Sequence, residues 1–119
     1  MKTNTLALFW LLLSVSIRAQ TPTLEWAAGF GGMLAESGIT VLTDHSGNTY
    51  IAGVMMGTVD FDPGADTFAL TSAGGEDIFI VKLNNGGELI WAKRIGGVNQ
   101  DHPSDMFQDD AGNLYLTGT

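Results

Sequence analysis

The chain has 119 residues, with five lysines and arginines, thirteen aspartates and glutamates, and a net charge of −8 at pH 7. So acidic a chain repels phosphate backbones, and a nucleic-acid partner is therefore not expected. It has no cysteine, which excludes a disulfide framework and a lipid-modified N-terminal cysteine. Sixteen glycines, with recurrent β-branched and aromatic runs, are typical of strands and tight turns.

Residues 1–19 have the organisation of a secretory signal peptide. Lys2 gives a short basic start, residues 6–17 (LALFWLLLSVSI) are a mostly apolar run of twelve, and Ala19 suits a cleavage site. A spanning helix needs roughly 20 apolar residues, so an uncleaved anchor is one alternative, and a buried core helix is another. We therefore expect export, cleavage after Ala19 and no stable membrane insertion afterwards. The mature chain, residues 20–119, keeps three basic residues against thirteen acidic ones.

An internal repeat with an offset of 65 residues runs through the mature chain. Residues 24–32 (LEWAAGFGG) match residues 89–97 (LIWAKRIGG), and the same shift aligns Asp44 with Asp109 and Tyr50 with Tyr115. The matches fall on residue types that shape strands and turns, which indicates a repeated structural unit. By this alignment, residues 24–29 are the last strand of a preceding unit. We expect them to form a clasp strand without a partner, unpaired with the strand at 88–95.

The rest of the first unit is predicted as short strands. Residues 39–44 and 48–54 flank a Gly-Asn turn and predict a β-hairpin. Residues 56–76 are predicted to be an inserted hairpin, with short strands at 58–61 and 67–71 around a Pro-Gly turn. Residues 77–83 and 88–95 flank Asn-Asn-Gly-Gly, a sequence that favours tight hairpin turns, and predict two further strands.

The second unit begins near residue 89 and is truncated at Thr119. Four short antiparallel strands repeated with tight turns are typical of a β-propeller blade, with a solenoid or a sandwich as alternatives. The predicted fold class is therefore all-β, with antiparallel four-stranded β-propeller blade repeats, about one and a half blades, over residues 20–119. Because a ring closes with about four to eight blades, we expect an incomplete propeller of marginal stability. Its partners would include missing C-terminal blades of the same polypeptide.

Four segments carry a family resemblance: DHSGNTYIAG, VDFDPG, LTSAGGEDIFIVKLNNGGELIWAKRIGG and DDAGNLYLTG. Together they resemble the SBBP-type bacterial β-propeller repeats, over about residues 24–119. The resemblance implies a secreted or cell-surface protein whose propeller is a structural or binding platform, and it carries no common catalytic residues. We therefore expect a non-catalytic scaffold or binding module for extracellular protein or polysaccharide. The alternative is part of a larger extracellular enzyme whose active site or catalytic domain lies downstream.

Asp60, Asp62 and Asp66 are the candidate metal ligands. Calcium prefers oxygen ligands on flexible loops, and the spacing of these carboxylates allows them to converge. Gly64 and Thr71 depart from the EF-hand pattern, so the site is predicted to be weak, and a solvated acidic hairpin tip is the alternative. No catalytic residue and no other cofactor is expected.

Other residues are expected to be structural. His45 and His102, each beside acidic residues, are predicted to be exposed loop histidines. Trp26 and Trp91 occupy the same place in the repeat, which favours packing between units over sugar stacking. Asp77 is predicted to be a turn or capping residue.

Overall fold

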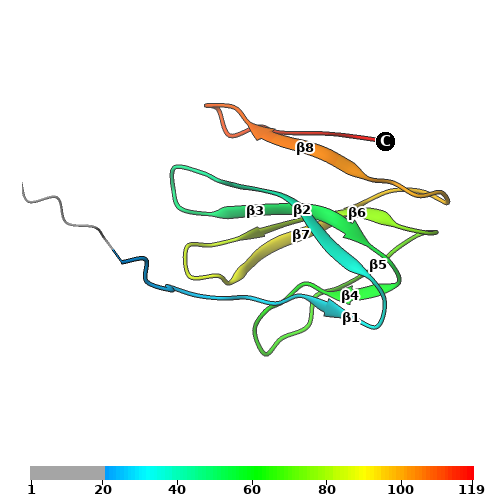
Figure 1. Cartoon of the computed structure of the whole chain (residues 1–119), viewed down its shortest axis with the longest axis horizontal. Helices are drawn as coiled ribbons and strands as arrows, with labels where there is room; N and C mark the ends of the chain where they lie inside the picture. Colours follow the sequence, from blue (N-terminus) through cyan, green and yellow to red (C-terminus); the bar gives the residue numbers. More distant parts are fainter. Residues whose placement is uncertain (1–20) are drawn as a thin grey trace, which may run out of the picture.

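The computed structural model describes residues 21–119, and its regular elements there are all β-strands (Figure 1). The expected signal peptide lies outside the described residues. The strands are β1 (Gly31–Gly32), β2 (Glu36–Thr43), β3 (Thr49–Met55), β4 (Thr58–Asp60), β5 (Ala69–Thr71), β6 (Asp77–Leu83), β7 (Leu89–Ile95), β8 (Pro103–Gln108) and β9 (Leu114–Gly118). All of their pairings are antiparallel. The prediction of an all-β antiparallel fold is therefore confirmed for this part of the chain.

The central element is a four-stranded sheet in the order β2-β3-β6-β7. Strands β3 and β6 form its middle, with Ile51 opposite Val81 and Ala52 opposite Ile80. β6 is buried on both faces: of its seven residues only Lys82 is not fully buried. Since neighbouring residues of a strand point to opposite faces, this burial pattern means that both faces of the sheet are covered.

A smaller three-stranded sheet, in the order β1-β4-β5, is built mainly from the segment between β3 and β6. The chain leaves the central sheet after Met55 and re-enters it at Asp77. Gly57 turns the chain with a positive φ of 71°, and the hydroxyls of Thr58 and Thr71 are hydrogen-bonded at 2.8 Å. The segment folds back onto the sheet that it interrupts.

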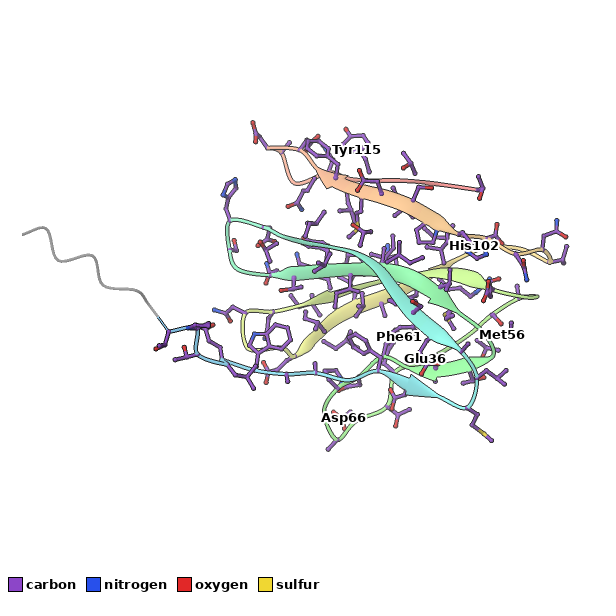
Figure 2. All side chains as sticks on the ribbon, viewed as in Figure 1. Glu36, Met56, Phe61, Asp66, His102 and Tyr115 are labelled. Atoms are coloured by element: carbon purple, nitrogen blue, oxygen red, sulfur yellow. The ribbon has the colours of Figure 1, made fainter. Side chains whose placement is uncertain are left out.

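This small sheet and the N-terminal segment cover the first face of the central sheet. Phe61 is fully buried there, with its ring centroid 4.9 Å from that of Phe79 and 5.6 Å from that of Phe30. Figure 2 shows Phe61 between the two sheets. The buried residues of this cluster are Met55, Val59, Phe61, Phe79, Val81, Leu83 and Ala92.

The β8–β9 hairpin covers the second face, so that the structure has three layers (Figure 1). Met106 of β8 is buried against the central sheet, and Leu114 and Leu116 of β9 pack beside it. The residues of the central sheet in this contact are Leu42, Tyr50, Ala52, Ile78, Ile80 and Trp91.

Residues 24–29 correct the prediction of a strand at this position. No regular structure is assigned to residues 21–30, and β7 has no strand on its outer edge in the described sheet. Trp26 instead lies over the β6–β7 turn, where a Cβ added to the buried Gly87 would meet its ring at 2.7 Å. A strand needs a partner for its backbone groups, and none is present here. The expected absence of pairing between this segment and residues 88–95 agrees with the sheet order.

Candidate functional site

The β2–β3 turn is organised by Asp44. Its Oδ1 accepts hydrogen bonds from the backbone N–H groups of Ser46 and Asn48, both at 2.9 Å. Its Oδ2 accepts from Asn48 Nδ2 at 2.8 Å and from the Tyr50 hydroxyl at 3.3 Å. Gly47 takes the positive φ of 81° that closes the turn. The carboxylate thus ties the turn to the start of β3.

The β8–β9 turn repeats this arrangement 65 residues later. Asp109 Oδ1 accepts from the backbone N–H of Asn113 at 2.8 Å, and its Oδ2 accepts from Asn113 Nδ2 at 2.9 Å and from the Tyr115 hydroxyl at 3.2 Å. Gly112 has a φ of 86°. The sequence match between the two turns therefore corresponds to the same hydrogen bonds.

The strand ends opposite these turns repeat as well. The pairing of β2 with β3 shifts register between Gly38 and Thr40, and that of β8 with β9 shifts between Pro103 and Asp105, the positions 65 residues on. Near each shift a glycine is required, because an added Cβ at Gly53 or Gly118 would lie 2.0 or 2.2 Å from a backbone oxygen of the partner strand. The two hairpins are structural equivalents over their full length.

Hydrogen bonding lowers the pKa of both turn carboxylates. The side-chain amide of Asn48 is the main cause for Asp44, assisted by backbone N–H groups and by Lys82, whose Nζ lies 3.9 Å away, while desolvation opposes the shift. The side chain and backbone of Asn113 hold the pKa of Asp109 below its ordinary value of 3.8. Both carboxylates are therefore charged at neutral pH.

A groove of about 310 Å³ lies between the two turns. It is lined by Asp44, His45, Ser46, Tyr50, Lys82, Gln108, Asp109, Asp110, Ala111 and Gly112. Gln108 Nε2 crosses it to donate to the Tyr50 hydroxyl at 3.2 Å, and Lys82 Nζ lies 4.9 Å from the centre of the Tyr50 ring. Its walls offer hydroxyl, amide, carboxylate and ammonium groups, which can hydrogen-bond a polar ligand.

The three aspartates proposed as calcium ligands are only partly brought together. Asp60 Oδ1 accepts from the backbone N–H groups of Asp62 and Phe68, at 3.0 and 2.9 Å, and Asp62 Oδ1 accepts from Gly64 at 2.7 Å. Asp62 and Asp66 line a pocket of about 410 Å³ that also includes Glu88. Asp66 lies on the loop that extends from the small sheet (Figure 2). Within residues 21–119, no three or more His, Cys, Asp or Glu side chains are grouped to hold a metal ion. Calcium binding at this tip stays a prediction.

Sequence reasoning missed the buried ion pair at the other end of the sheet. Asp77 is fully buried at the start of β6 and pairs with Arg94 of β7. It also accepts from the backbone N–H of Ala73 at 2.8 Å, so it fastens the small sheet to the central one, a role close to the expected capping. The only sequence signal was an acid directly before a buried strand.

The two histidines differ from each other. His45 is exposed, as predicted, and lines the groove. His102 is partly buried, which corrects the prediction, and its Nε2 lies 3.0 Å from Glu76 Oε2 rather than beside Asp101 or Asp105 (Figure 2). Because Glu76 precedes β6 and His102 precedes β8, this contact links the two repeat units.

The two tryptophans also have different surroundings. Trp91 packs on the second face with its ring 6.1 Å from that of Tyr50, edge to face, in the contact with β8–β9. Trp26 packs on the first face. Trp91 thus lies between units as expected, whereas Trp26 packs within its own unit.

The depressed pKa values of Asp44 and Asp109 predict a loss of stability in acid. Their folded pKa values lie below 3.8, so the unfolded chain binds more protons there and the free energy of unfolding falls as the pH drops through this range. In urea titrations between pH 5 and pH 2, the double variant D44N/D109N should show a flatter pH dependence. Asp110→Asn, which removes the adjacent exposed carboxylate, should keep the wild-type slope. Equal slopes in all three proteins would contradict the assignment.

The chain is similar to one curated protein, an uncharacterized WD repeat-containing protein of Acanthamoeba polyphaga mimivirus. The two are 28% identical over 108 residues, which is 79% of this chain. The match is only 8% of the length of that protein. No family model matches the chain, and no solved structure matches it. The similarity therefore supports a repeat fold of the β-propeller type without assigning the chain to one family.

Proposed function

We propose that this chain is a segment of an exported β-propeller repeat protein, of the SBBP type, and that it acts as a non-catalytic scaffold and binding module. In this proposal each unit is a blade, residues 56–76 are an insertion within the first blade, and the second blade begins near residue 89. Blades stack face to face around an axis, and the groove between neighbouring turns receives the partner.

The observation that carries the proposal is the position of the β8–β9 hairpin. It repeats the hydrogen bonds and register shift of β2–β3 and packs its apolar side against the second face of the central sheet. Sheets of about four strands packed face to face in series are the arrangement of a propeller. The similarity to a WD repeat-containing protein supports the same architecture, because WD repeats form four-stranded blades.

A binding role is supported by how the polar groups are used. Asp77 is paired with Arg94, and His102 is paired with Glu76, while Asp44 and Asp109 hold turns. These acids and this histidine therefore have structural partners. The groove at the turns combines Lys82, Gln108 and Asp110 with an aromatic hydroxyl. Such a lining matches a hydroxyl-rich chain, and we favour an extracellular polysaccharide over a protein as its partner.

Blade stacking is tested by truncating the two sides of β8 separately. Met106 is 6% exposed and Phe107, its neighbour on the opposite side, is 63% exposed. Met106→Ala should lower the free energy of unfolding by about 2–5 kcal/mol, because it removes buried contacts with the central sheet. Phe107→Ala removes a larger side chain yet should cost less than about 1 kcal/mol. Urea denaturation measures both, and equal effects would show that β8–β9 does not pack as described.

Export and binding are tested in one experiment with the tagged chain in a bacterial host. We expect the protein outside the cytoplasm with Gln20 as its first residue, and Leu12→Arg, which interrupts the apolar run, should retain it inside. The exported protein is then passed over immobilised bacterial polysaccharides. Retention that weakens about tenfold in Lys82→Ala, but not in Glu25→Ala, supports the groove. Retention of an extracellular protein instead, or of neither, overturns the choice of polysaccharide.

A further inference from the structure

The contact between the two repeat units is made by cross-strand pairs. On the central sheet, Leu42 of β2 lies opposite Tyr50 of β3, and both face the second unit. On the hairpin, Met106 of β8 lies opposite Leu116 of β9, and both face the first unit. Directly opposite residues share one face of a sheet. One pair therefore packs against the other, and both belong to the apolar cluster on this face.

The same pairs exist at the equivalent positions of the other unit, where they are uncovered. Shifting Leu42 and Tyr50 by 65 residues leads to Phe107 and Tyr115, which are 63% and 52% exposed, with ring centroids 6.3 Å apart. They lie on the side of the hairpin away from the central sheet. The contact surface of the first unit is thus present a second time, without a covering layer in the described structure.

The other half of the contact also recurs. Shifting Met106 and Leu116 back by 65 residues leads to Val41 and Ile51, an opposite pair on the first face of the central sheet. Val41 is 64% exposed and Ile51 is partly buried. The small sheet covers the β6–β7 half of this face and leaves the β2–β3 half accessible. Beside Ile51 lies an apolar pocket of about 280 Å³ whose walls include Phe30, Phe61 and Phe79.

We propose that a second copy of this chain covers these surfaces: Phe107 and Tyr115 of one copy pack on Val41 and Ile51 of the next. This inference rests on the proposed stacking of repeat units, since it repeats the internal contact between two chains. Each copy carries both halves of the contact, one on each outer side. The pocket beside Ile51 can receive one of the two exposed rings, in the same way that Tyr50 is covered within the chain.

The predicted interface is heterologous, because the two surfaces are different. Such contacts are not satisfied in a dimer and continue into rings or open chains of copies. The net charge of −8 opposes association. Apolar contact is the driving force, so added salt should strengthen the association by screening the repulsion between copies.

Sedimentation of the whole chain over a range of concentrations tests the proposal. The weight-average mass should rise with concentration, and more steeply at about 0.5 M than at about 0.05 M salt. Phe107→Asp and Val41→Asp each block one surface at an exposed position and should weaken association at least about tenfold. Val98→Asp is the matched control: Val98 is 83% exposed and lies outside both surfaces, and this variant should associate like the wild type.

Mixing the two blocked variants gives the decisive result. Each retains the surface that the other lacks, so an equimolar mixture should form a one-to-one dimer although neither variant associates alone. A wild-type chain that stays monomeric, or a Phe107→Asp variant that associates like the wild type, overturns the inference. Amide exchange on the monomer separates the two levels: protected β8–β9 amides leave the stacking of units intact, and unprotected ones remove the proposed function as well.

Discussion

The central constraint is that the β3–β6 pair is apolar on both of its faces. Val81 and Phe79 point to one side and Ile80 and Ile78 to the other, and all four are buried. Burying an apolar side chain is worth about 1.5–3 kcal/mol, whereas a sheet with one face in water would lose this for half of its core. The chain must therefore cover the sheet twice, and it does so with two different segments.

The two covers differ in origin, and this difference explains the architecture. The first cover is local: the segment between β3 and β6 returns as β4 and β5, fastened by Asp77 and by the ring of Phe61. The second cover is the β8–β9 hairpin, whose turn and register repeat those of the strands that it covers. A unit that covers its predecessor exposes an equivalent face in turn. Seriality is thus a consequence of two-sided burial and of the repeat.

Much of the central sheet could be predicted from local sequence. The expected strands at 77–83 and 88–95 correspond to β6 and β7, because an apolar run bounded by Asn-Asn-Gly-Gly has few other solutions. The start of β2 at Glu36 was missed, since Ser37 and Gly38 carry no strand signal and pair only because β3 is long enough to reach them. The expected strand at 24–29 did not form, because its likeness to β7 reports ancestry of the repeat and not the presence of a pairing partner.

The candidate site was less predictable because it depends on contacts distant in sequence. The Asp-Gly-Asn-Tyr pattern indicated two turns, but only the packing of β8–β9 places Gln108 beside Tyr50 and creates the groove between them. The pairing of His102 with Glu76 has the same origin. Asp60 was visible as an acid in a turn, yet its use as an acceptor for Phe68 requires the closed hairpin.

The central claim is that β8–β9 lies on the Tyr50 face of the sheet, and nuclear Overhauser contacts test it directly. In the folded chain, the side chain of Gln108 should show contacts to the ring of Tyr50, since its Nε2 lies 3.2 Å from the hydroxyl, and the Met106 methyl should show contacts to residues of the same cluster. Contacts from Met106 to Phe79 or Val81, on the opposite face, would contradict the account, as would a folded β8–β9 hairpin without contacts to the sheet.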